Sequence, residues 1–144
     1  MRRKLPALSV KQPWAALIVH GLKTIEVRTW PALQRGWILI HASSQEDERV
    51  EGWKRVPDYA AKLSQLRGGV IGAASLVDSV TYRDRRDFAR DKNRHLNRPE
   101  WFQEPALYGF VLECAIQLPF RKLPGWVKFF EVMYSAEHLP AALR

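Results

Sequence analysis

Short runs of strand-type residues, separated by connections of very unequal length, constrain the fold of this chain more than any other feature. The runs are rich in Val, Ile, Leu and aromatic residues, as β-strands are. They lie at Leu5–Val10, Thr24–Trp30, Gly36–His41, Val70–Val80, Tyr108–Leu118 and Phe129–Tyr134. The connections are too irregular for repeated strand–helix–strand units. The pattern therefore favours an α+β fold, in which a curled, largely antiparallel sheet is flanked by helices.

Two segments between these runs are expected to be helical. The first, Pro13–His20, opens with a proline, which the first turn of a helix tolerates, has apolar residues at helical spacing and ends at Gly21. The second, Gln45–Leu66, begins with an acidic turn that suits a helix N-terminus, and Pro57 divides it into two helices. A short terminal helix is expected at Ala136–Leu143.

The charge of the chain says more about its partners than about its fold. Lys and Arg number 23 against 15 Asp and Glu, which gives a net charge of +8. Much of the excess lies in Tyr82–Arg98, which is expected to be partly helical or mobile. Phosphate backbones and anionic lipids are the partners that such an excess attracts, and its combination with many aromatic residues is typical of RNA binding. A merely solvated basic surface is the alternative.

Membrane and export signals are not visible in the sequence. No segment approaches the roughly 20 apolar residues of a membrane span, and Met1–Ser9 lacks the apolar core of a signal peptide. The lone cysteine, Cys114, excludes an internal disulfide and agrees with a reducing compartment. We therefore expect a cytoplasmic protein with one domain over residues 1–144 and no membrane partner, either a monomer or a weak dimer.

Two blocks near the N-terminus resemble the ASCH domain family of the PUA-like superfamily. Leu8–Ala15 follows the family's Leu-Ser-x-x-Gln-Pro-Trp opening, and Gly21–Trp30 follows its Gly-x-Lys-Thr-x-Glu-x-Arg motif. Further apolar blocks that are similar to the family lie at Ile40–Ser43, Gly69–Gly72, Tyr108–Leu112 and Gly125–Phe130. The first two blocks are specific as a pair, and the resemblance extends over about residues 5 to 132. The basic segment at Tyr82–Arg98 matches no motif of the family.

The resemblance implies a PUA-like fold, a curled β-barrel of five or six strands flanked by helices. We expect the Leu5–Val10 and Thr24–Trp30 strands to be adjacent, and the Pro13–His20 helix to pack against the barrel rim. The resemblance also implies a cleft beside this helix and the Gly-x-Lys strand. It implies RNA binding, because members of the family are associated with RNA. Some small members are amidohydrolases on acetylated cytidine, and ribonuclease activity has been attributed to others.

The residues expected to carry chemistry are Lys23, Glu26 and His41. Lys23 stands at a strand entrance, where it could hold a phosphate or, if desolvated, act as a base or nucleophile. Glu26 and Arg28 share one face of the strand, and their spacing alone suggests a surface ion pair; the resemblance instead places them at the cleft. His41 is a candidate general acid–base in RNA cleavage or a structural histidine. No cofactor or metal is expected, because the histidines and the cysteine show no ligand spacing.

The expected nucleic-acid contacts are Lys11, Gln12, Trp14, Arg28, Trp30 and Ser43. Trp30, which ends a strand, is the best candidate for stacking on a base, whereas Trp14 is expected to pack beneath the cleft. Lys11 is a candidate phosphate contact. Gln12 could hydrogen-bond a base edge or cap the helix, and Ser43 could line the cleft.

Three functions remain open at this stage. The first is an RNA-binding domain, in particular a metal-independent ribonuclease on single-stranded RNA. The second is an amidohydrolase on N4-acetylated cytidine nucleosides, although Glu26 stands where those enzymes have a threonine, and their later carboxylate could be Asp78, Asp84 or Asp87. The third is a non-catalytic nucleic-acid-binding adaptor. The net charge favours a polymer over a nucleoside, since a small nucleoside needs no extended basic surface.

Overall fold

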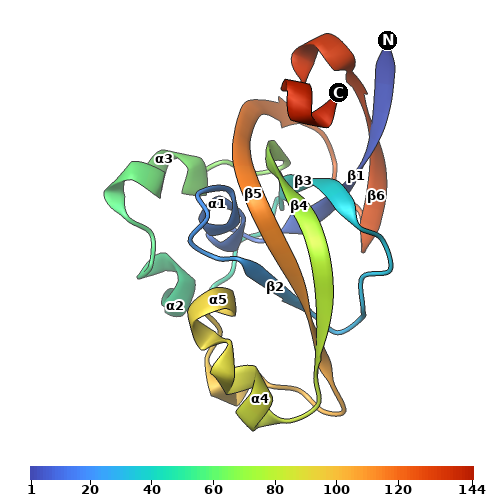
Figure 1. The fold of residues 1–144 in the computed structure, drawn as a ribbon. Helices are drawn as coiled ribbons and strands as arrows, with labels where there is room; N and C mark the ends of the chain where they lie inside the picture. The colour runs from blue at the N-terminus through green and yellow to red at the C-terminus, as the bar shows by residue number, and fades with distance from the viewer.

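A computed structural model describes residues 1–144 and shows one curled, six-stranded sheet with short helices around it (Figure 1). The strands are β1 (Arg2–Val10), β2 (Ile25–Arg28), β3 (Gly36–Ala42), β4 (Gly69–Tyr82), β5 (Leu107–Lys122) and β6 (Phe129–Ser135). Their order across the sheet is β2-β5-β4-β3-β1-β6, and every pair is antiparallel except β1 with β3. The predicted α+β class and curled sheet are confirmed, but β2 and β6 do not pair, so the barrel is not closed.

The predicted adjacency of the first two strands is wrong. β1 has β3 on one side and β6 on the other, so no edge is left for β2, which pairs only with β5. The pairing with β6 stops at Leu8, however, and leaves the last residues of β1 open on that side. There the Arg28 guanidinium of β2 donates a hydrogen bond of 2.8 Å to the Ser9 carbonyl oxygen. The two strands thus meet through a side chain, across the opening of the curled sheet.

Helix α1 (Trp14–Val19) fills the space between the sheet and the other helices, and all six of its residues are buried. It contacts β3, β4 and β5, so it packs over inner strands of the sheet, whereas the sequence predicted packing against the rim of a barrel. Gln12, just before the helix, is fully buried. Its amide nitrogen donates to the carbonyl oxygens of Leu63 and Leu66 at 2.8 and 3.1 Å, and its oxygen accepts from the Ala16 amide at 3.0 Å. This side chain fixes the start of α1 against the helix Ala61–Ser64 and the residues that follow it.

The segment expected to hold two helices contains three short ones. These are α2 (Val50–Trp53), the 3-10 helix η1 (Asp58–Ala60) and α3 (Ala61–Ser64). The break at Pro57 is present, but Gln45–Arg49 is not helical. The Asp47 side chain turns inward and bonds the Trp14 indole, so it does not cap a helix.

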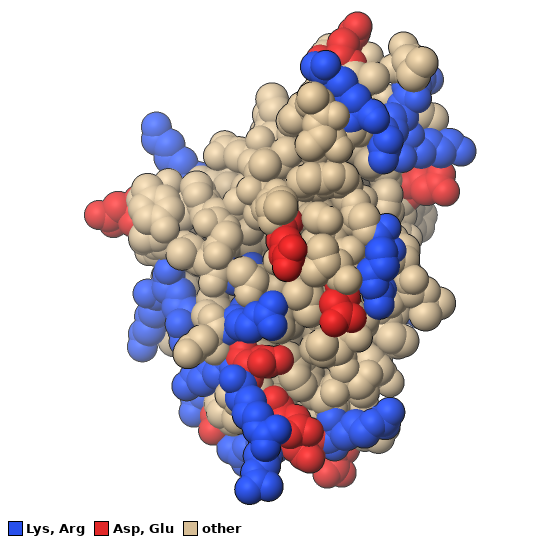
Figure 2. All heavy atoms as spheres, in the orientation of Figure 1, with Lys and Arg blue, Asp and Glu red and all other residues tan.

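The basic segment folds into helices at one end of the molecule. α4 (Arg85–Arg90), α5 (Lys92–His95) and the 3-10 helix η2 (Pro99–Trp101) follow the tip of β4. Figure 2 shows Lys and Arg side chains gathered over this end, with Asp and Glu among them. The C-terminal residues form two 3-10 turns, η3 (Ala136–His138) and η4 (Ala141–Leu143), beside the N-terminus (Figure 1). None of the helices has the length and apolar character needed to cross a membrane.

Strand alternation divides the core between the two faces of the sheet. On the α1 face, Leu8 and Ile40 pack with the helix in a cluster of 19 buried residues. On the other face, Ala7 and Leu39 belong to a second cluster, which Leu143 of η4 helps to cover. The opening between β1 and β2 lies at the margin of the first cluster, and the candidate site is found there.

Candidate functional site

A hollow of about 520 Å³ lies where the end of β1, strand β2, the loop before α2 and the loop between β5 and β6 come together. Its lining includes five Lys or Arg side chains, two carboxylates and three tryptophans. The cations are Lys11, Lys23, Arg28, Arg49 and Lys128. A positively charged hollow with aromatic walls has the chemical character of a site for a nucleotide or a nucleic-acid strand.

Lys23 is the most constrained of these cations. It follows the turn that ends α1, where its backbone amide donates to the Leu17 carbonyl oxygen at 3.1 Å, and its side chain is only 2% exposed. The ammonium donates to the His95 carbonyl oxygen and, at 3.4 Å, to the Asn97 side-chain oxygen. It also lies 3.6 Å from the nearer Glu26 oxygen. Burial lowers the pKa of Lys23 from 10.5 to about 8, and the Glu26 carboxylate opposes part of that shift.

Glu26, on β2, lies between the cationic side chains of Lys23 and Arg28. One of its oxygens faces Lys23, and the other accepts a hydrogen bond of 3.0 Å from the Arg28 Nε. The carboxyl group is 10% exposed, so this is no ordinary surface ion pair. Arg28 is held from the other side by the Ser9 carbonyl oxygen. Glu26 therefore fixes Lys23 and Arg28 relative to each other at the wall of the hollow.

A second ion pair, between Asp47 and Arg49, was not predicted from the sequence. Asp47 accepts from the Trp14 indole at 2.8 Å, from two nitrogens of the Arg49 guanidinium at 2.7 to 3.1 Å and from the Arg49 backbone amide at 2.9 Å. Partial burial by itself would raise the Asp47 pKa, but the hydrogen bonds from Arg49 and Trp14 outweigh it and lower the pKa to about 2. The Arg49 guanidinium lies 3.7 Å from the centre of the Trp101 ring. The sequence did not reveal this pair, because the acidic run Glu46–Glu48 was interpreted as the first turn of a helix.

Aromatic side chains form two walls of the hollow. Trp30, half-buried, packs edge-on against Phe110 and Phe129 at centroid distances of 5.1 and 5.5 Å, with the Lys128 ammonium 5.7 Å from its ring centre. Trp126, in the loop between β5 and β6, is 71% exposed. Trp126 was not singled out in the sequence, although it lies inside the Gly125–Phe130 block.

Two of the expected site residues do not line this hollow. Gln12 is buried beneath it by the hydrogen bonds that hold α1. His41 is 1% exposed, and its ring nitrogens bond the Ser9 hydroxyl at 3.0 Å and the Leu123 carbonyl oxygen at 2.8 Å. It lines a neighbouring hollow instead. The structure therefore brings together the remaining expected residues: Lys11, Trp14, Lys23, Glu26, Arg28, Trp30 and Ser43.

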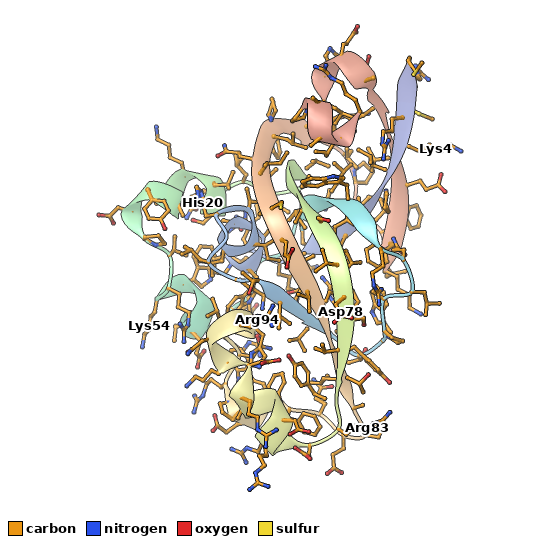
Figure 3. All side chains as sticks on the ribbon, in the orientation of Figure 1. Lys4, His20, Lys54, Asp78, Arg83 and Arg94 are labelled. Atoms are coloured by element: carbon orange, nitrogen blue, oxygen red, sulfur yellow. The ribbon has the colours of Figure 1, made fainter.

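None of the three aspartates considered for the amidohydrolase carboxylate lies at the hollow. Asp78 is on β4 (Figure 3) and its side chain is 62% exposed. Asp84 caps α4 by accepting from the Asp87 amide, and Asp87 pairs with Arg90 on the same helix. The carboxylates that do line the hollow are Glu26 and Asp47, and both are ion-paired.

Comparison with known proteins agrees with the resemblance seen in the motifs. The model of the family described as "ASCH domain" matches residues 8–123. Human activating signal cointegrator 1 is 28% identical over 104 residues, which cover 64% of this chain and 17% of that protein. The mouse protein is 32% identical over 82 residues, covering 51% of this chain and 14% of the relative. The chain thus matches less than a fifth of the length of either relative.

Solved structures share the fold. The crystal structure of ASCH from Zymomonas mobilis superposes with a TM-score of 0.58 at 21% identity, covering 82% of this chain and 73% of that one. A mutant of the Zymomonas protein gives a TM-score of 0.57 at 23% identity, over 84% and 75% of the two chains. At this identity the similarity concerns the fold. Because the family model spans most of its length, the chain belongs to the ASCH domain family.

Proposed function

We propose that this ASCH domain binds single-stranded RNA in the hollow beside β2 and cleaves it without a metal ion. The observation that carries the proposal is the position of Lys23. Its ammonium is buried, has a pKa near 8 and lies in the wall of a cationic, tryptophan-lined hollow. Perturbed titratable groups in clefts are typical of active sites. Membership of the ASCH domain family, whose resemblance implied RNA binding, is consistent with a nucleic-acid partner.

The shape of the hollow supports a single strand as the ligand. A base can enter a space of about 520 Å³ only after it has left its stack, which costs least in a single strand. Trp30 and Trp126 offer apolar ring surfaces to such a base. Lys11 and Lys128 also line the hollow, where they can neutralise the adjoining phosphates.

The chemistry requires a base for the 2′-hydroxyl and a cation for the phosphorus centre. With a pKa of about 8, Lys23 is neutral in roughly one molecule in ten at pH 7. In that form its amine takes the proton from the 2′-hydroxyl, and the 2′-oxygen bonds to phosphorus. The 5′-oxygen then leaves with that proton, and a 2′,3′-cyclic phosphate remains. Arg28 stabilises the charge that develops on the phosphate oxygens, and Glu26 holds the Lys23 and Arg28 side chains in place.

An amidohydrolase acting on N4-acetylated cytidine is the second candidate. A desolvated lysine amine in a nucleoside-sized hollow favours it, because such an amine can act as a nucleophile or base on an amide. Glu26 in place of the threonine of those enzymes speaks against it. A non-catalytic adaptor would use the same hollow for binding alone.

One panel of substrates separates these candidates. Labelled single-stranded RNA, double-stranded RNA, single-stranded DNA and N4-acetylcytidine are incubated in parallel with the protein, with and without EDTA. We expect EDTA-resistant cleavage of single-stranded RNA alone, with cyclic phosphate ends. Release of acetate from acetylcytidine would instead establish the amidohydrolase. Binding of RNA without any product would support the non-catalytic adaptor. Loss of cleavage in EDTA would refute the metal-independent mechanism.

A further inference from the structure

A second hollow, of about 760 Å³, adjoins the first. The two share four lining residues, Ser9, Ser43, Trp126 and Val127. Trp126 and Val127 therefore form a ridge between two spaces, and each is large enough for one nucleotide. The floor of the second hollow is made by His41 and the chain around Gly125.

The loop that carries this ridge is anchored at its base. The Leu123 amide donates to the Gly68 carbonyl oxygen at 3.1 Å, and the Leu123 carbonyl oxygen is bonded by the His41 ring at 2.8 Å. Gly125 packs so closely on His41 that a Cβ atom there would lie 2.8 Å from the imidazole. His41, predicted to be an acid–base group, thus has a structural use, because it positions the loop that presents Trp126.

The exposure of the ridge is unusual for its residue types. Trp126 and Val127 are 71% and 84% exposed, although the loop beneath them is held in place. Exposed apolar side chains on an anchored loop indicate a surface that a ligand covers. An indole ring that is 71% exposed and lines both hollows is suited to stacking between neighbouring bases.

The charges around the ridge indicate what that ligand is. Lys122 lines the second hollow and Lys128 lines the first, so a lysine stands on each side of Trp126. No carboxylate lines the second hollow, and the Ser9, Ser43 and Ser44 hydroxyls provide uncharged hydrogen-bonding groups there. A phosphodiester that crosses the ridge would meet cations on both sides.

We propose that the two hollows bind two consecutive nucleotides of one strand, with Trp126 stacked between them and Lys122 beside the phosphate of the second. The inference rests on the proposed function and sharpens it: the ligand is an oligonucleotide, and a free nucleoside would fill only half of the site.

The test compares ligands of increasing length. Binding of 2′-O-methyluridine 5′-monophosphate, 2′-O-methyluridine 3′,5′-bisphosphate and the 5′-phosphorylated 2′-O-methyl dinucleotide is measured by NMR titration; the methyl group prevents cleavage. We expect the dinucleotide to bind roughly tenfold more tightly than the monophosphate, because one base–tryptophan stack is added. The bisphosphate controls for the added charge and should gain less than the dinucleotide.

Variants then test whether the higher affinity of the dinucleotide comes from the second hollow. Trp126→Ala should reduce the dinucleotide advantage to less than about threefold. Lys122→Gln should weaken the dinucleotide about threefold and leave the monophosphate unchanged, since one phosphate contact is lost. Lys62→Gln, a matched change of an exposed lysine on α3, should alter neither.

The outcomes separate the inference from the function beneath it. Equal affinities for monophosphate and dinucleotide, or an advantage that survives both Trp126→Ala and Lys122→Gln, overturn the two-nucleotide site and leave the proposed function standing. Equal binding of bisphosphate and dinucleotide overturns the stacking role of Trp126. If neither these ligands nor longer single-stranded RNA binds, the proposed function fails and the inference fails with it.

Discussion

The molecule has two basic regions that differ in how their charges are held. At the hollow, Lys23 and Glu26 are almost fully buried and pair with each other; Lys23 also donates to the His95 carbonyl oxygen, and Glu26 also pairs with Arg28. At the α4–α5 end, Arg85 pairs with Glu100 and Arg90 with Asp87 at 3.0 Å, but every one of these side chains is at least 45% exposed. Figure 2 shows exposed Lys, Arg, Asp and Glu side chains gathered at this end. The two regions adjoin at His95, the last residue of α5, whose carbonyl oxygen accepts from the buried Lys23 ammonium.

The comparison shows that the number of charges in a region and the burial of those charges determine different properties. Exposed ion pairs contribute at most about 1 kcal/mol and are screened by salt, so the α4–α5 end mainly sets the long-range field. Buried, hydrogen-bonded groups have fixed positions, and burial also lowers the pKa of Lys23; both are properties that chemistry requires. Three experiments can break or sharpen this comparison.

The largest expected effect is on turnover. Lys23→Met keeps the length and burial of the side chain but removes the amine, so RNA cleavage should fall by about a thousandfold or more. RNA affinity should fall less than about threefold, because the other cations of the hollow remain. Lys92→Met, the matched change on α5, should leave the rate unchanged. The measurement is single-turnover cleavage beside a titration with non-cleavable RNA, and a Lys23→Met protein with wild-type activity would refute the catalytic role.

The second effect is on stability against pH. The folded-state pKa of Lys23, about 8, lies below its unfolded value of 10.5, so between these pH values the unfolded chain binds more protons. The free energy of unfolding of the wild type should therefore rise relative to Lys23→Met as pH increases from 8 to 10.5, by about 3 kcal/mol. Below pH 8 the cost of the buried charge is fully present and the difference should be constant.

Urea unfolding of both proteins across this pH range measures the effect. Taking the difference between the two cancels the tyrosines, which titrate in both. A difference that stays flat from pH 8 to 10.5 would show that Lys23 keeps its charge in the fold, and would make it a phosphate-binding group with no role as a base.

The fold and half of the site were accessible from the sequence for a definite reason. The Gly-x-Lys-Thr-x-Glu-x-Arg motif places Lys23, Glu26 and Arg28 on one turn and one strand, and local geometry then decides their relation. Likewise, the strand-type residues of each run identified the strands, and the irregular connections between the runs favoured the curled sheet. These are short-range properties, in which neighbours in the chain are neighbours in space.

What was missed depends on long-range contacts. Strand order could not be derived, because the pairing of β1 with β3 and β6 is set by residues far along the chain. Asp47 and Trp126 reach the hollow from distant loops. His41 and Gln12 were expected at the site because they lie within blocks that resemble the family. The structure instead uses both in internal hydrogen bonds, His41 with the Leu123 carbonyl oxygen and Gln12 with the Leu63 carbonyl oxygen.

The smallest expected effect concerns the exposed basic end. Wild-type affinity for single-stranded RNA should fall with salt, with a log–log slope of about −2 or steeper, since each phosphate contact in a single strand contributes about −0.7. Replacing Arg85, Arg86 and Arg90 with Gln should weaken binding only about threefold at low salt and leave turnover unchanged, because two of the three are already paired with carboxylates and all act through solvent. Lys11→Gln, one change at the hollow, should weaken binding at least as much. A larger loss of affinity in the triple variant would show that the main RNA contact is on α4. A wild-type affinity that does not change with salt would show that the basic side chains are only a solvated surface.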